Sequence, residues 1–234
     1  MVYLYEDVSI TILGAYMMED MEIYLKPTYI IDSDSSEIRE YASMITQGFK
    51  GTKIEMAKEI YYAVRDGIWY DPYTPFHLPE HYMASVVLRR GRGFCVSKAS
   101  VLCALGRACN IPTRVGFADV KNHLVTKELL DFLGTDLFVY HGFVEFYLNG
   151  KWVKATPAFN RELCETHKVP PLEFNGYEDS LFQPYNLEKK KFMEYVKYHG
   201  TFHDIPVDKI ISAWKEAYGK ERVEGWIRSF KSPI

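Results

Sequence analysis

The 234-residue chain lacks the features that would place it in a membrane, in a secreted class or on nucleic acid. It has no run of about 18 apolar residues, the length that a membrane-spanning helix needs. Its N-terminal stretch has no basic start, and acidic residues interrupt the apolar run, so we expect no secretory signal peptide. The formal net charge is −3, which gives no electrostatic basis for nucleic-acid binding. We therefore expect a cytoplasmic protein that binds neither a membrane nor a nucleic acid.

Cysteine is scarce, and its spacing suits neither a disulfide framework nor a metal site. The chain has four cysteines and no Cys-x-x-Cys pair. No stretch resembles an EF-hand loop, and we expect no metal ion and no organic cofactor. We expect all four cysteines to be reduced thiols, and three of them to be ordinary buried apolar residues: Cys103, Cys109 and Cys164.

Helices come before strands along much of the chain, and this order favours an α+β fold. Hydrophobic residues make up 47% of the sequence, enough to bury the core of one large domain or two small ones. Capping-box patterns predict two of the helix starts. The helices that we expect cover residues 34–46, 52–68, 83–90, 95–109, 187–199, 206–218 and 220–229. The strands that we expect cover residues 1–12, 25–32 and 113–120, and a hairpin covers 137–157.

The hairpin is the clearest pattern in the sequence. Two apolar runs flank Asn149-Gly150, a dipeptide that strongly favours a two-residue hairpin turn. This turn fixes the register of the two strands, so that Leu148 faces Lys151 and Tyr147 faces Trp152. Because side chains alternate along a strand, the register also predicts which residues share a face.

His141 lies in the first strand of this hairpin and has two candidate partners. In a regular register, Thr156 and Asn160 are its neighbours on the same face. Either side chain has an oxygen that can accept a hydrogen bond from the imidazole and orient it. Pro157 lacks an N–H group and can end the strand pairing before residue 160. Both alternatives therefore stay open.

Cys95 lies where the glycine-containing loop RGRGF leads into a helix. The first N–H groups of a helix have no partner within the helix, and the helix dipole adds partial positive charge there. Both effects favour a thiolate over a thiol. Gly91 and Gly93 let the backbone approach a substrate closely, so a loop amide and the Cys95 N–H are candidates for stabilising an oxyanion. We expect Cys95 to have a lowered pKa and to be the most reactive of the four thiols.

In combination, these elements resemble the transglutaminase-like superfamily, whose core is papain-like. Three motifs carry the resemblance: Gly-x-Gly-x-Cys before a helix, the helix end RACNIPTRV before a strand, and a His-x-aromatic-Val-Glu strand that turns into Trp-Val-x-x-x-Pro. The resemblance covers about residues 25–165. It implies an α+β, papain-like core in which a helix that carries Cys95 packs against an antiparallel sheet that carries His141.

The resemblance also implies roles for the site residues. Cys95 would be the nucleophile and His141 the base, with no cofactor. The family has an aspartate that orients the histidine, whereas this sequence has Thr156 at that position, in WVKATP. A threonine hydroxyl can hold the imidazole but carries no charge to stabilise imidazolium. Asn160 is the alternative third residue, as in papain-like Cys-His-Asn sites.

We expect three regions: an N-terminal extension with a strand (1–24), the transglutaminase-like core (25–165) and a mostly helical region packed on the core (166–234). The expected activity is acyl transfer from an amide of a protein or peptide substrate. Water as the acceptor gives a cysteine protease or amidase, and an amine gives a transglutaminase. The alternative is a non-catalytic binding or scaffold protein on the same fold, which uses its cleft for a protein or peptide partner. The Cys95–His141 pair favours the enzyme, and the missing aspartate favours the alternative.

Overall fold

The computed structural model describes residues 21–231, which form a mixed fold of helices and an antiparallel sheet. Its helices are α2 (Ser36–Ile45), α3 (Lys53–Gly67), α4 (Ala84–Arg90), α5 (Cys95–Ala108), α6 (Lys127–Leu133), α7 (Arg161–Thr166), α8 (Val207–Tyr218) and α9 (Lys220–Lys231), with a 3₁₀ turn at Pro79–His81. Its strands are β1 (Trp69–Tyr70), β2 (Arg92–Gly93), β3 (Thr113–Asn122), β4 (Leu137–Leu148), β5 (Lys151–Ala155) and β6 (Met193–Phe202).

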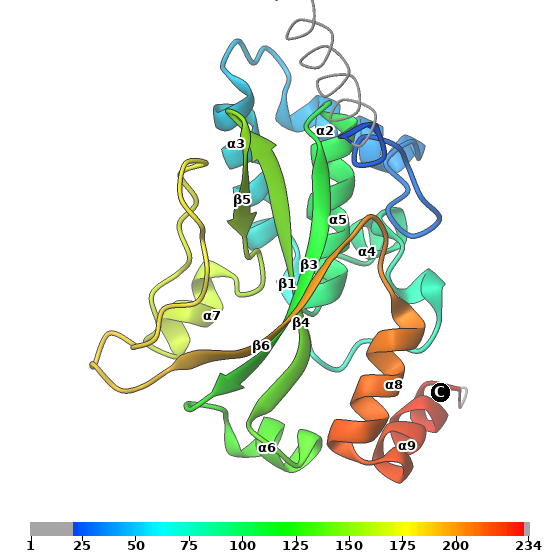
Figure 1. Ribbon diagram of the computed structural model, residues 1–234, viewed down its shortest axis with the longest axis vertical. Helices are drawn as coiled ribbons and strands as arrows, with labels where there is room; N and C mark the ends of the chain where they lie inside the picture. The colour runs from blue at the N-terminus through cyan, green and yellow to red at the C-terminus, as the bar shows by residue number, and fades with distance from the viewer. Residues whose placement is uncertain (1–20, 232–234) are drawn as a thin grey trace, which may run out of the picture.

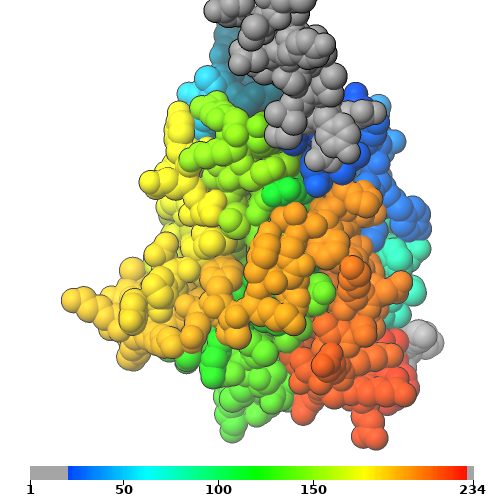
Figure 2. Space-filling model, in the orientation of Figure 1, coloured from blue at the N-terminus to red at the C-terminus, as the bar shows by residue number. Residues whose placement is uncertain are grey.

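The central helix α5 lies against a four-stranded sheet of order β5-β4-β3-β6 (Figure 1). Helices α2, α3 and α4 also pack against α5. Every residue from Val96 to Arg107 is therefore buried, as expected for a helix with neighbours on all sides. Figure 2 shows the sheet side of the molecule, where β6 lies at the front and α8 and α9 form the lower right corner beside α6.

Local signals in the sequence predicted most of these elements correctly. Thr52 caps α3 and forms the expected capping box with Glu55. Gly91 ends α4 with a φ of 67°, a left-handed conformation that glycine adopts without strain. Helix α5 ends before Pro112, and the strand after it matches the predicted 113–120. The predicted helices at 206–218 and 220–229 correspond to α8 and α9.

The hairpin of β4 and β5 has the predicted turn and register. Leu148 pairs with Lys151, and Tyr147 pairs with Trp152. The pairing ends at Val144 and Ala155, so the regular register does not continue to His141. Because β5 stops there, the part of β4 that carries His141 pairs only with β3.

Two predicted elements are wrong, and one lies outside the described residues. Residues 187–199 do not form a helix: β6 begins at Met193 and pairs with β3. This stretch is rich in Lys and Glu, which favour helices, but pairing with a sheet outweighs the local propensity. Residues 25–32 form bends and turns rather than a strand. The predicted strand at 1–12 lies outside residues 21–231.

The region after residue 165 is therefore less helical than predicted, since it supplies β6 to the central sheet. The domain boundaries at residues 24 and 165 stay a prediction. No helix among residues 21–231 is long and apolar enough to cross a membrane.

Candidate active site

Cys95 is the first residue of α5, and a tight loop presents it. The Ser97 hydroxyl accepts a hydrogen bond from the Phe94 N–H at 3.1 Å and so fixes the entry into the helix. A Cβ atom on Gly93 would lie 2.7 Å from Ser97 Oγ, so this position needs glycine. The short parallel pair of β1 and β2 joins Gly93 to Tyr70 and anchors the loop.

His141 follows a β-bulge in β4. Ala118 of β3 pairs with His141, and Val120 pairs with Phe138, so two residues of β4 stand opposite one residue of β3. Tyr140, in the bulge, has a φ of 56°, which is uncommon for a residue with a side chain. A bulge re-aims the side chains beside it, and here the next side chain is that of His141.

Asp119 and His199 support this bulge from the neighbouring strands. Asp119 Oδ1 accepts a hydrogen bond from the Tyr140 N–H at 3.0 Å and contacts His199 Nε2 at 2.6 Å. The His199 ring stacks on the Tyr140 ring with their centroids 4.1 Å apart. The sequence reasoning missed this group, because Asp119, Tyr140 and His199 come together only through the pairing of β3 with β4 and β6.

Cys95 and His141 line one cavity at the junction of α5 and β4. The helix and the strand are in close contact here, since a Cβ atom on Gly142 would lie 2.9 Å from Val96 Cα. The backbone N–H groups of Gly142, Val96 and Cys95 all act to lower the pKa of the Cys95 thiol. The fold thus brings together the two residues that the sequence analysis singled out, with amide donors around the sulfur.

Burial nevertheless raises the pKa of Cys95 to about 11, so the predicted lowered pKa is wrong for this structure. Cys95 keeps some contact with solvent, but protein atoms surround its sulfur closely enough that loss of hydration outweighs the three N–H groups. Burial likewise lowers the pKa of His141 to about 3. Both side chains are therefore neutral near pH 7.

His141 lies in an aromatic pocket, and no charged side chain of the described residues holds it. Its ring contacts Phe182, with centroids 4.9 Å apart, and Tyr195 at 6.5 Å. Nε2 of His141 is buried without a hydrogen-bond partner among the described residues. The side chain can therefore accept a proton, but nothing in the described part of the chain stabilises its protonated form.

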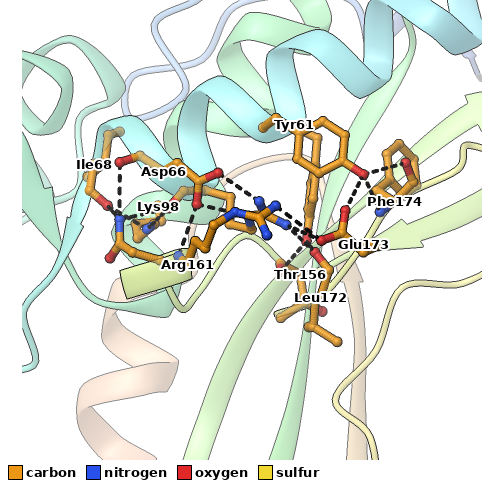
Figure 3. A network of polar contacts seen from close by, with 12 residues as sticks. Tyr61, Asp66, Ile68, Lys98, Thr156, Arg161, Leu172, Glu173 and Phe174 are labelled. Atoms are coloured by element: carbon orange, nitrogen blue, oxygen red, sulfur yellow. Dashed lines mark hydrogen bonds and ion pairs between the residues drawn. The ribbon is translucent and has the colours of Figure 1, made fainter. Parts of the chain in front are cut away.

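Thr156 follows β5 and is buried near the same aromatic side chains. Its hydroxyl makes no hydrogen bond among residues 21–231, although it is close enough to Tyr195 to moderate the raised pKa of that phenol. Its carbonyl accepts a hydrogen bond from the Tyr61 hydroxyl at 3.1 Å (Figure 3). Thr156 and His141 thus share Tyr195 as a neighbour, and no hydrogen bond joins them directly.

Asn160 is bound elsewhere and makes no hydrogen bond to His141. Its Nδ2 donates to the carbonyls of Arg65 and Ile68, each at 2.8 Å, and its Oδ1 accepts from the Tyr70 N–H at 2.7 Å. These bonds use the hydrogen-bonding capacity of the amide. Asn160 therefore holds the segment after α3 in place rather than the imidazole.

Lys98 reaches the same carbonyl groups from α5. It is buried, and its Nζ donates to the carbonyls of Arg65 and Ile68 (Figure 3). The C-terminal end of α3 carries the negative end of a helix dipole, which suits a cation. Burial still lowers the pKa of Lys98 to about 7. Lys98 and Asn160 together tie α5 and the chain after β5 to the end of α3.

Two histidine pairs have a four-residue spacing that resembles that of metal ligands, and the sequence reasoning overlooked both. His77 and His81 have ring centroids 4.7 Å apart, and the other pair is His199 and His203. Neither pair gathers a third ligand, because residues 21–231 contain no group of three or more His, Cys, Asp or Glu side chains that would hold a metal ion.

Comparisons with known proteins agree with this geometry. The sequence profile of the transglutaminase-like superfamily matches residues 39–157, just over half of the chain. No curated protein sequence matches the chain at a significant level. The matched residues include Cys95, His141 and Thr156.

Two solved structures are similar to this chain. One is a protein from Cytophaga hutchinsonii, provisionally named a cysteine protease, with a TM-score of 0.51 and 17% identity over 82% of this chain and 50% of that protein. The other is a protein from Parabacteroides distasonis, provisionally named a protease, with a TM-score of 0.38 and 20% identity over 58% of this chain and 25% of that protein. This chain thus spans half the length of the first protein and a quarter of the second.

A helix that presents a cysteine to a histidine on an antiparallel sheet defines a papain-like core. The chain belongs to the transglutaminase-like superfamily.

Proposed function

We propose that this protein is a cytoplasmic thiol enzyme that transfers an acyl group from an amide of a protein or peptide. Cys95 is the nucleophile and His141 is the base. The observation that supports this proposal is the shared cavity of Cys95 and His141, with three backbone N–H groups around the sulfur. Superfamily membership supports the same reaction class. The acceptor is water in a protease or amidase and an amine in a transglutaminase.

The neutral state of both side chains determines how the proposed reaction begins. As the sulfur attacks the carbonyl carbon, its proton passes to an unprotonated nitrogen of His141, and the carbonyl electron pair moves to oxygen. Backbone N–H groups near Cys95 are suited to stabilise that oxyanion. The intermediate then expels the amine, which takes the proton from His141 and leaves a thioester. Water or a second amine attacks the thioester, its proton passes to His141 and then to the sulfur, and the thiol is restored.

A non-catalytic binding protein is the second candidate. Thr156 stands where the family has an aspartate, and burial disfavours the charged forms of Cys95 and His141. In that case the cavity would bind a protein or peptide partner without turnover.

Trapping the acyl-enzyme separates the two candidates. The wild-type protein is mixed with a peptide p-nitrophenyl ester, quenched in acid and analysed by peptide mass mapping. We expect an acyl group on Cys95, little or none in the His141→Gln variant, and an unchanged yield in the matched Cys103→Ser variant. Acylation of the other thiols at the same rate as Cys95, or of none at all, would favour the binding protein.

A further inference from the structure

The cavity that Cys95 and His141 share is a partly open space of about 70 Å³. Helices α8 and α9 supply much of its wall, through Trp214, Tyr218, Trp226 and Phe230. These four residues lie outside the residues 39–157 that match the superfamily. The space is therefore built by a part of this chain that the superfamily profile does not describe.

The lining of this space is uncharged. No Asp, Glu, Lys or Arg side chain is among the described residues that line it. Two of its polar groups are already paired, because the Trp214 indole donates to the Val139 carbonyl at 2.8 Å and the Tyr218 hydroxyl accepts from the Val139 N–H at 2.7 Å. A charged group placed here would lose its hydration without gaining a partner. The lining thus suits an apolar occupant.

The size of the space limits that occupant further. An engineered apolar cavity of about 150 Å³ in another protein holds one benzene molecule. This space is about 70 Å³, less than half of that volume, so it does not enclose a whole aromatic ring. It fits a branched aliphatic group of three or four carbons, such as the side chain of valine or leucine.

A second cavity of about 350 Å³ adjoins the first and shares Tyr70, Pro72, Leu129 and Phe138 with it. Its lining includes polar side chains, among them Thr126. A ligand that places a small apolar group beside Cys95 therefore has a larger and more polar space for the rest of its chain.

We propose that the apolar space beside Cys95 selects acyl donors by a short aliphatic side chain next to the reacting carbonyl. This role for the apolar space rests on the proposed function, since it takes the Cys95 sulfur as the attacking atom. The substrate class is then a peptide with valine, leucine or a similar residue at this position. Peptides with a charged or an aromatic residue there bind poorly.

Binding can be tested without turnover in the Cys95→Ser variant. N-acetyl amides of valine, leucine, phenylalanine, lysine and glutamate are titrated while the indole N–H signals of the four tryptophans are followed by NMR. We expect the valine and leucine amides to shift the signals of Trp214 and Trp226, and the signals of Trp69 and Trp152 to stay in place. The lysine and glutamate amides should bind at least about tenfold more weakly.

A variant that enlarges the space tests the size argument. Phe132 lines the cavity and stacks on Trp226, with ring centroids 4.5 Å apart. Phe132→Ala should allow the phenylalanine amide to bind, with an affinity gain of at least about tenfold. Phe202→Ala is the matched control, because Phe202 packs on Phe117 and does not line the cavity. The control should not change the preference.

The outcomes for the subsite and for the proposed function are distinguishable. Equal binding of charged, aromatic and aliphatic amides, or no shift of Trp214 and Trp226 with any amide, would overturn the subsite. Selective binding supports it, even if the wild-type protein forms no acyl-enzyme, in which case only the proposed function fails. Acylation of Cys95 at equal rates by valine and lysine esters would leave the proposed function intact and overturn the subsite.

Discussion

At Cys95, two opposing effects act on one sulfur atom. Three N–H groups near the start of α5 and in β4 favour the thiolate, and burial favours the thiol. Burial is the larger effect, and the pKa rises to about 11. A helix start therefore activates a cysteine only where solvent or a charged partner offsets the loss of hydration.

The reactivity of Cys95 should follow this raised pKa. We expect its alkylation rate with iodoacetamide to rise about tenfold per pH unit from pH 6 to 9, because the thiolate fraction grows by that factor well below the pKa. The measurement is peptide mass mapping after short exposures. A plateau below pH 8 would instead indicate a thiolate–imidazolium pair with His141 and would contradict the expected pKa.

The burial of His141 makes the stability of the protein depend on pH. Its pKa is about 3 in the folded chain and 6.5 as the reference value, so the unfolded chain binds a proton that the folded chain excludes between these two pH values. The part of the free energy of unfolding that depends on a neutral His141 is fully present above pH 6.5 and is lost as the pH falls towards 3. The slope from this one group is at most about 1.4 kcal/mol per pH unit.

The His141→Gln variant should lack this part of the acid sensitivity. We expect its free energy of unfolding, measured by urea titration at several values from pH 7 to 4, to fall less steeply than that of the wild type. His167→Gln is the control, because His167 is exposed. If the wild type and His141→Gln show parallel slopes, His141 is not kept neutral by the fold.

At the scale of elements, the site depends on how closely the start of α5 approaches β4. Gly142 makes this approach possible, since a Cβ atom there would lie 2.9 Å from the backbone of Val96. A backbone atom cannot rotate away as a long side chain can. The strand and the helix would have to separate to accept any larger residue.

Gly142→Ala should therefore destabilise the protein by about 1–3 kcal/mol and slow the alkylation of Cys95. Gly225→Ala is the matched change in α9, where the new Cβ atom would meet only an arginine side chain, at 3.9 Å. It should stabilise the protein by about 0.5–1 kcal/mol, because alanine favours a helix more than glycine does. Thermal and urea unfolding measure both changes. A neutral Gly142→Ala would mean that the two elements lie further apart.

At the scale of the whole molecule, α8 hydrogen-bonds to β4 at Val139. Trp214 and Tyr218 bind the carbonyl and the N–H of Val139, just before the bulge that leads to His141. Side chains of the helix thus bind the backbone of β4 at a position where β4 lacks β5 as a neighbour. The C-terminal helices and the sheet are joined at the site itself.

Tyr218→Phe tests this connection. The change leaves the buried Val139 N–H without its acceptor, which should cost about 1–3 kcal/mol and speed hydrogen exchange of that amide. Tyr177→Phe, at a side chain that is 56% exposed, should change stability by less than about 0.5 kcal/mol. Unchanged exchange at Val139 in Tyr218→Phe would show that the helix does not protect the strand.

The sequence by itself determined the features that depend on residues close together in the chain. Thr52 and Glu55 form a capping box, Gly91 ends a helix, and Asn149-Gly150 sets a hairpin turn and its register. Each involves groups a few residues apart, so local geometry decides it. The placement of Cys95 at a helix start followed in the same way, and the family motifs gave the fold class.

Only the tertiary structure decided what depends on residues far apart in the chain. Residues 193–202 became β6 because β3 offered backbone partners that outweigh helix propensity. Asn160 bound carbonyls at the end of α3, more than 90 residues away, instead of His141. The pKa of Cys95 rose because surrounding elements remove water from its sulfur. Strand pairing, hydrogen-bond partners and hydration are set by packing across the molecule, which no local pattern of residues records.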